Sequence, residues 1–199
     1  PTDGPAFPRA EAASAQDAVP AADQPRLRLL NWRGVARADG AVYLPGQIEC
    51  LKAGEFFRGQ WRVCTPVNAA PFSAVGYFFG RKLVDYLDVP VGLINVAIGG
   101  SPAEAWIRRK ALASHPQLSA MTRGLWLNNA ALEPWCRSRG THNLQQALTE
   151  KETIPGDDLG PNHPFKPGFL WDTALAPFTR LPIAGVLWYQ GESNSESDW

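Results

Sequence analysis

The sequence predicts an α/β fold in which helices pack on a parallel β-sheet. The run Gly92–Ile98 is apolar and rich in β-branched residues, as expected for a strand buried on both faces of the sheet. A second apolar run of strand length, Ile183–Tyr189, lies near the other end of the chain. Between Phe72 and Leu87, apolar residues recur at spacings of three and four, which is typical of a helix. The order helix, strand, glycine pair, helix is that of a layered βαβ-type sheet.

The composition describes a chain of ordinary size without an excess of either charge. Its 199 residues suffice for one domain with a sizeable core, and its 19 basic residues balance its 19 acidic ones. A net charge of zero offers no electrostatic attraction for nucleic acid or an anionic membrane. No apolar run approaches the ~20 residues of a membrane-spanning helix. We therefore expect neither a nucleic-acid partner nor a membrane partner.

Cysteine and histidine usage predicts no metal site, and we expect no cofactor. The histidines lie far apart and lack the paired spacing of metal ligands. The cysteines show no C-x-x-C spacing, and two alternatives remain open: a Cys50–Cys64 disulfide with Cys136 free, or three buried thiols. Eight tryptophans suit a cleft for sugar rings, although core packing is the commoner use of tryptophan.

The first half of the chain supplies a strand and the long helix. Leu27–Trp32 predicts a short strand, and Asn68 is the expected N-cap of a helix with Pro71 in its first turn. Asp88-Val89-Pro90 is expected to end that helix. The predicted core-facing stripe of the helix consists of Phe72, Val75, Phe79, Leu83 and Tyr86 or Leu87.

A glycine pair follows the first buried strand. Gly99-Gly100 permits a tight turn or a positive φ, and Ser101-Pro102-Ala103-Glu104 reads as a capping box that starts the next helix. An open α/β sheet binds its ligands where a strand ends and a helix begins, because free amides and the positive helix end meet there. The alternative is a glycine turn that serves only close packing.

The second half contains a variable region and another strand end. Residues 110–168 read as an insertion of helices and loops, with a helix expected over Asn143–Lys151, and 169–177 reads as a short helix. After Ile183–Tyr189 come the polar residues Gln190, Glu192, Ser193 and Asn194, which predict a second crevice position. The alternative is a polar turn in which Ser193 or Asn194 caps a helix.

Several stretches resemble one known family. The sequence VLWYQGESN at 186–194 is similar to the W-Y-Q-G-E-S-N signature of the sialate O-acetylesterase family, which belongs to the SGNH (GDSL-like) hydrolases. GLINVAIGGSPAEAW is similar to the G-L-I-x-S-x-x-G-G-T-x-x-E-A-W segment of that family, and FSAVGYFF resembles its F-S-A-V-A-Y-F-F helix. Cys64-Thr65-Pro66 fits as well, and the matches fall in family order from Trp61 to Asn194 with a gap in the insertion.

The resemblance implies a three-layer α/β/α sandwich with a parallel, flavodoxin-like sheet, and a serine esterase that removes O-acetyl groups from sugars. Such an enzyme needs a serine activated by histidine and donors for the tetrahedral oxyanion. Gly100 and Asn194 carry over as oxyanion donors, with Gln190 as a rival to Asn194. Glu192 is expected to orient the histidine or hold its loop, and Gly99 and Ser101 to line the substrate crevice. Glu104 and Trp106 match family positions that we interpret as cap and packing.

The chain departs from the family at two motifs. It has no G-Q-S-N motif for the nucleophile, since its Gly-Gln pairs precede Ile48 and Trp61, and it has no D-x-x-H motif for the base. We therefore expect residues 1–199 to be a partial, single esterase domain with an incomplete sheet, inactive alone, whose nucleophile and histidine lie upstream and downstream in the remainder of its chain. Ser101 and Ser193 are the internal alternatives, but no G-x-S-x-G elbow surrounds Ser101.

Two other functions compete with the esterase. The first is a non-catalytic carbohydrate-binding protein on the same fold. The second is a phosphate- or nucleotide-binding domain that uses the glycine pair, although no G-x-G-x-x-G or G-x-x-x-x-G-K-[ST] motif supports it. For the esterase the expected partner is an acetylated carbohydrate, and family and tryptophan content together predict a secreted or periplasmic protein.

Overall fold

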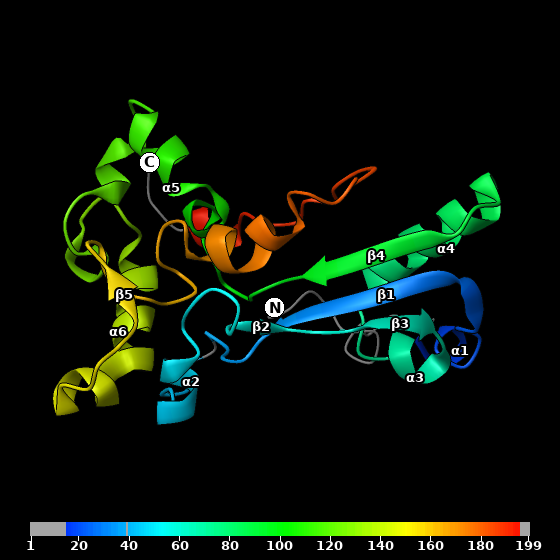
Figure 1. Ribbon diagram of the computed structural model, residues 1–199, viewed down its shortest axis with the longest axis horizontal. Helices are drawn as coiled ribbons and strands as arrows, with labels where there is room; N and C mark the ends of the chain where they lie inside the picture. Colours follow the sequence, from blue (N-terminus) through cyan, green and yellow to red (C-terminus); the bar gives the residue numbers. More distant parts are fainter. Residues whose placement is uncertain (1–14, 39, 196–199) are drawn as a thin grey trace. The chain divides into compact units, whose positions relative to one another are not determined.

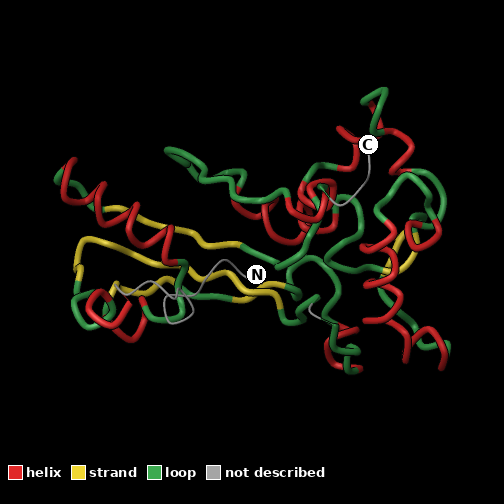
Figure 2. The backbone as a smooth tube through the Cα atoms, turned by 180° about the vertical axis from the view of Figure 1, so that it is seen from behind, coloured by secondary structure: helices red, strands yellow, loops and turns green. Residues whose placement is uncertain are grey.

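The computed structural model describes residues 15–38 and 40–195. The chain divides into two compact units, which are described separately (Figures 1 and 2). Unit 1 comprises residues 1–33 and 58–99, and unit 2 comprises residues 34–57 and 100–199.

The sheet of unit 1 is built around β1 (Gln24–Gly34). β4 (Val91–Val96) pairs with β1 in parallel, in a register that runs from Leu27 opposite Val91 to Trp32 opposite Val96. β3 (Trp61–Cys64) pairs with β1 antiparallel, and the short β2 (Phe57–Arg58) also pairs with β1. The predicted α/β class is therefore confirmed, whereas the prediction of a wholly parallel sheet is not, because the described sheet is mixed.

β4 is less buried than its apolar sequence predicts. Most of its residues are half-buried, and Gly92 is exposed. Among the described residues β4 pairs along one edge only, so its other edge gains no cover from a neighbouring strand. Asn95 stands opposite Asn31 in the ladder, and its amide donates to the Asn31 side-chain oxygen at 2.8 Å. The one polar residue of the run is thus satisfied by its direct neighbour on β1.

Two helices replace the single helix start predicted at Asn68. α3 (Pro66–Ala69) is capped by Thr65, and α4 (Ala74–Leu87) is capped by Ser73, whose hydroxyl accepts from the Gly76 amide at 3.2 Å. The Asn68 side chain instead donates to the Val63 carbonyl at 3.0 Å, so its expected role as N-cap of the long helix is wrong. The end of α4 is confirmed, since Asp88 adopts a left-handed C-cap conformation with φ 56°.

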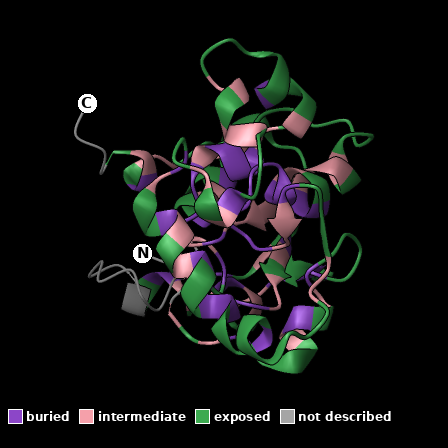
Figure 3. Ribbon diagram, turned by 90° about the vertical axis from the view of Figure 1, so that its left-hand side faces the viewer, coloured by how far each residue is buried: buried purple, intermediate pink, exposed green. Residues whose placement is uncertain are grey.

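The buried face of α4 is rotated from the predicted stripe. Tyr77, Gly80 and Val84 are on the buried side, whereas Val75 and Phe79 are exposed. A Cβ at Gly80 would lie 2.5 Å from Leu93, so the glycine allows α4 to approach β4 closely. The face that carries Gly80 therefore packs on the sheet. The core of unit 1, within the purple regions of Figure 3, contains Ala18, Ala22, Leu27, Leu29, Cys64, Ala69, Phe72, Ala74, Tyr77 and Val84.

Unit 2 is made mostly of short helices. They are α2 (Pro45–Glu49), η2 (Ala103–Trp106), α5 (Arg109–Ser114), η3 (Ser119–Thr122), η4 (Trp126–Asn128), the long α6 (Pro134–Glu150), η5 (Trp171–Leu175), η6 (Ala176–Phe178) and η7 (Glu192–Asn194). Its small antiparallel sheet is a hairpin of two strands with two residues each, β5 (Gly156–Asp157) and β6 (Gly160–Pro161). α6 begins earlier than the predicted Asn143. The short helix predicted at 169–177 is confirmed as a helical segment that contains the π-helix η5 and the 3-10 helix η6.

The core of unit 2 surrounds a buried histidine. The His163 ring stacks on Tyr43 and on Trp126, with ring centroids 5.6 Å and 5.5 Å away. Its Nε2 lies 3.1 Å from the Asn143 side-chain oxygen, and its Nδ1 accepts from the Phe165 amide at 3.0 Å. Complete burial lowers the pKa of His163 to about 3, with a further contribution from the charge of Arg139. The imidazole is therefore neutral, with its proton on Nε2.

The predicted strand Ile183–Tyr189 is not a strand. The segment is irregular, and Val186 and Tyr189 are 77% and 80% exposed. An apolar run becomes a buried strand only if a neighbouring strand satisfies its backbone, and no described strand pairs with this one.

No disulfide joins Cys50, Cys64 or Cys136 in the structure, and Cys64 and Cys136 are buried whereas Cys50 is half-buried. Within residues 15–38 and 40–195, no helix is both long and apolar enough to cross a membrane.

Candidate functional site

Two loops far apart in the sequence meet within unit 2. The residues after the glycine pair and the residues of η7 are joined by hydrogen bonds, although Ala103 and Asn194 are 91 positions apart. We call Ser101, Glu104, Gln190, Ser193 and Asn194 the carboxamide cluster. In Figure 1 the red η7 lies beside the green η2. The structure thus brings together most of the residues that the sequence placed at two separate strand ends.

Asn194 is the centre of the carboxamide cluster. Its Oδ1 accepts from the Ala103 backbone amide at 2.8 Å and from Gln190 Nε2 at 2.9 Å. Its Nδ2 donates to Glu104 Oε2 at 3.0 Å. A flipped carboxamide would turn its NH₂ toward two donors and its oxygen toward a carboxylate, so these contacts define one orientation. Since an amide nitrogen carries two N–H groups, one N–H of Asn194 has no acceptor among the described residues.

Gln190 is the less available of the two predicted side-chain donors. Its Nε2 donates to the Ser101 carbonyl at 3.1 Å and to Asn194 Oδ1 at 2.9 Å. Both N–H groups are therefore engaged within the protein. The geometry favours Asn194 over Gln190 as a donor to a bound molecule.

The side chains of Ser101 and Ser193 form hydrogen bonds within the protein rather than with a base. Ser101 is 5% exposed, and its Oγ accepts from the indole Nε1 of Trp106 at 2.9 Å. The Ser193 hydroxyl donates to the Gly100 carbonyl at 2.8 Å. The predicted capping box is wrong, because η2 begins after Pro102 and its Ala103 amide is capped by Asn194 instead.

The described histidines are engaged away from these serines. His142 Nε2 lies 2.8 Å from the Gly40 carbonyl, His115 Nδ1 accepts from the Gln117 amide, and both ring nitrogens of His163 have partners in the core. A serine nucleophile requires a base within hydrogen-bond reach. Among the described residues, no histidine is hydrogen-bonded to Ser101 or Ser193.

Gly100 requires glycine for two reasons. Its φ of +70° is unfavourable for other residues, and a Cβ there would lie 2.7 Å from Trp135 Cη2 and 3.4 Å from Phe165 Cζ. The backbone at Gly100 therefore lies close to two aromatic rings from the predicted insertion. Gly99 is the half-buried last residue of the unit 1 segment, and its role in substrate binding stays a prediction.

Glu192 lies outside the hydrogen bonds of the cluster. The residue is exposed, and its side chain makes no hydrogen bond to any described residue. Its backbone carbonyl accepts from the Ser195 hydroxyl at 2.7 Å. Its predicted role in orienting a histidine therefore stays a prediction.

Glu104 has a side-chain position that the sequence analysis did not predict. Its side chain is buried at 4% exposure and turns to Asn194 rather than back to the cap. Burial raises its pKa, its own backbone amide and Asn194 oppose the rise, and the charge of Glu133 adds to it. The sequence signal that could have indicated a buried carboxylate here is the single acidic residue within the otherwise apolar A-E-A-W run.

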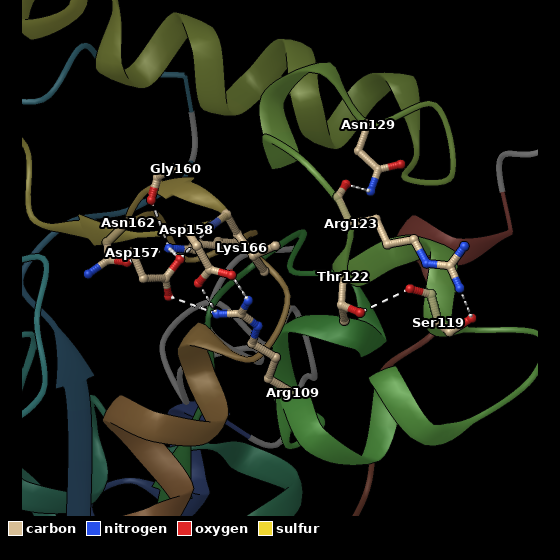
Figure 4. A network of polar contacts seen from close by, with 11 residues as sticks. Arg109, Ser119, Thr122, Arg123, Asn129, Asp157, Asp158, Gly160, Asn162 and Lys166 are labelled. Carbon is tan, nitrogen blue, oxygen red and sulfur yellow. Dashed lines mark hydrogen bonds and ion pairs between the residues drawn. The ribbon is translucent and has the colours of Figure 1, made fainter.

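A network of hydrogen bonds and ion pairs connects the start of α5 with β5 and Lys166 (Figure 4). Arg109, at the start of α5, forms an ion pair with Asp158 and lies 3.5 Å from Asp157. The buried amine of Lys166 donates to three oxygens, Asp157 Oδ1 at 2.6 Å, Gly160 O at 2.8 Å and Asn162 Oδ1 at 2.9 Å. Burial lowers the pKa of Lys166, and Asp157 opposes that shift.

This network connects to the cluster through the backbone. The Gly168 amide, two residues after Lys166, donates to the Glu104 carbonyl at 3.0 Å. The predicted insertion therefore supports the loop that carries Glu104. No group of three or more His, Cys, Asp or Glu residues in the described part of the chain is arranged to hold a metal ion.

Comparison with known proteins finds relatives that are named as esterases. The chain is 30% identical over 128 residues to the sialate O-acetylesterase of Rattus norvegicus, a match that covers 64% of this chain and 22% of the relative. It is 31% identical over 122 residues to that of Homo sapiens, covering 61% and 17% of the two chains. The chain therefore matches only about a fifth of the length of these relatives.

A solved structure agrees with the sequence relatives. The crystal structure of a carbohydrate acetylesterase from Xanthomonas citri superposes with a TM-score of 0.52 at 26% identity, over 93% of this chain and 30% of the other. No protein-family model matches the chain. The resemblance found in the motifs is nevertheless confirmed: over about two thirds of its length, this chain is a homologue of the sialate O-acetylesterases.

Proposed function

We propose that this chain supplies the oxyanion-stabilising part of a carbohydrate O-acetylesterase. The observation that carries the proposal is the oriented carboxamide of Asn194, which keeps one N–H available after its protein contacts are made. The Gly100 amide is the second proposed donor. The names of the relatives, sialate O-acetylesterase and carbohydrate acetylesterase, support an O-acetylated sugar as the substrate.

The proposed chemistry is ester hydrolysis through a tetrahedral intermediate. A serine hydroxyl attacks the acetyl carbonyl, a histidine takes the hydroxyl proton, and the carbonyl oxygen becomes an oxyanion. Donors aimed at that oxygen lower the barrier, and loss of one such donor costs about 10²–10³-fold in kcat. Gly100 and Asn194 would serve at this step as the two donors.

The nucleophile and the base are proposed to lie outside these 199 residues. The chain contains neither the G-Q-S motif nor the D-x-x-H motif of the family. The hydroxyls of Ser101 and Ser193 are already engaged with Trp106 and Gly100. These contacts also favour the second candidate, a carbohydrate-binding protein on the same fold that performs no hydrolysis.

The test is acetate release from O-acetylated sialic acid and from an acetylated polysaccharide. Both the 199-residue chain and the protein isolated from the organism that encodes it are assayed, and the intact mass of each is measured. We expect the isolated protein to be heavier than 21.7 kDa, to release acetate and to be inhibited by a fluorophosphonate, and the chain alone to be inactive.

Two results would overturn parts of the proposal. If the folded, isolated protein binds a sugar but releases no acetate from it, the carbohydrate-binding alternative holds. If the 199-residue chain releases acetate alone, the nucleophile is internal, and Ser101→Ala and Ser193→Ala variants identify it.

A further inference from the structure

Glu104 and Asn194 form a hydrogen-bonded pair in which the carboxylate residue is buried and the carboxamide residue is half-buried. Glu104 offers a carboxylate oxygen to Asn194 Nδ2 at 3.0 Å, and the side of the carboxamide that carries Oδ1 is occupied by the Ala103 amide and Gln190. Glu104 itself is held through its backbone, because its carbonyl accepts from the Gly168 amide at 3.0 Å. The carboxylate is therefore presented to Asn194 from a braced position.

We propose that Glu104 is a positioning residue, whose buried carboxylate fixes the Asn194 carboxamide in the orientation that leaves its second N–H free for the substrate. This inference rests on the proposed function. A carboxylate has only acceptors, so it selects the NH₂ side of the amide and rejects the oxygen. A hydrogen bond to an ionised group is also stronger than a neutral one, by roughly twofold.

The pair has a direct spectroscopic readout in the 199-residue chain. The two Nδ2 protons of Asn194 give side-chain amide signals, which are identified by their loss in Asn194→Asp. In the wild type we expect one of them to exchange slowly with water. Glu104→Ala removes the acceptor, and we expect that proton to exchange on the order of 10-fold faster, which corresponds to about 1.4 kcal/mol.

Two further variants separate positioning from a general effect on folding. Glu104→Gln keeps an acceptor of the same size, so we expect it to restore at least part of the slow exchange. Glu133→Gln removes the neighbouring charge that acts on Glu104 but no hydrogen bond to Asn194, so the Asn194 signals should remain those of the wild type. Unchanged exchange in a folded Glu104→Ala variant would overturn the proposal.

A titration of the wild type keeps the proposal testable if Glu104→Ala does not fold. Because burial raises the pKa of Glu104, the Asn194 amide shifts should follow one titration above pH 4.5. The charge of Glu133 also acts on Glu104, so the same measurement is repeated in the Glu133→Gln variant. Asn194 shifts that stay constant across this range would overturn the pairing.

The link to catalysis is tested by a double-mutant cycle in the isolated, acetate-releasing protein. Asn194→Ala and Glu104→Ala should each lower kcat, and Glu104→Ala should add nothing once Asn194 is alanine. Additive losses would show that Glu104 acts by another route. A protein without acetate release would refute the proposed esterase, whereas the exchange measurements would still decide the Glu104–Asn194 pairing.

Discussion

Replacing Gly100 with alanine tests how the site loop is packed. The left-handed φ of +70° costs a residue with a Cβ about 1–2 kcal/mol. The new methyl group would also meet Trp135 at 2.7 Å, and overpacking costs about 1–3 kcal/mol. Trp135 is 36% exposed and has room to shift, so we take the lower end of that range. The expected loss in the free energy of unfolding is about 2–3 kcal/mol in total.

The assay is urea unfolding followed by tryptophan fluorescence. With a slope of about 2 kcal/mol per molar urea, the midpoint of Gly100→Ala should fall by roughly 1 M. Gly124→Ala is the matched control, because Gly124 has a similar φ of +65° but no atom within 4 Å of its Cβ position. The unfolding free energy that Gly124→Ala loses should therefore be the conformational cost alone.

A comparison of these two variants decides the matter. If Gly100→Ala costs no more than Gly124→Ala, the steric argument at Trp135 is refuted. If both variants unfold at the wild-type midpoint, the left-handed conformation at these glycines is refuted as well. Trp135→Leu provides a further check, since in that background the two glycine substitutions should cost the same.

Three other predictions concern stability. Ser73→Ala should lower the free energy of unfolding by about 1 kcal/mol, because α4 loses its N-cap, and a smaller urea-midpoint shift than in an exposed-serine control would contradict this. The folded-state pKa of His163, about 3, lies below its ordinary 6.5, so the unfolded chain binds the extra proton between these values. Stability should therefore fall by about 1.4 kcal/mol per pH unit below pH 6.5, and His163→Gln, compared by urea unfolding at each pH, should remove that slope. Lys166→Met removes the buried amine that donates to the Gly160 and Asn162 oxygens and should cost about 1–3 kcal/mol, whereas the exposed Lys110→Met should cost little. Equal unfolding midpoints would refute the role of Lys166.

Local sequence signals predicted several elements well. The apolar run after Pro90 is β4, and Leu27–Trp32 is the central part of β1. Asp88 ends α4, as the Asp-Val-Pro sequence indicates. These features depend on residues close together in the chain, such as turn formers and short apolar runs. They can therefore be predicted without knowledge of the tertiary structure.

Predictions that depended on burial were less reliable. Both faces of α4 carry apolar residues, and the face that packs on the sheet is the one with Gly80, which lets Leu93 approach closely. The run Ile183–Tyr189 has the composition of a buried strand but finds no described strand beside it. Apolar composition favours burial, whereas a strand also needs a neighbouring strand that hydrogen-bonds its backbone.

The sequence by itself determined the α/β class, the family resemblance, and the two loops in which site residues occur. Only the tertiary structure decided what the side chains in those loops do. Ser101 and Glu104 have the sequence of a capping box, but Ser101 binds Trp106 and Glu104 binds Asn194. The physical reason is that a hydrogen bond depends on distances of a few ångström between atoms. For groups 90 positions apart, the path of the folded chain sets those distances.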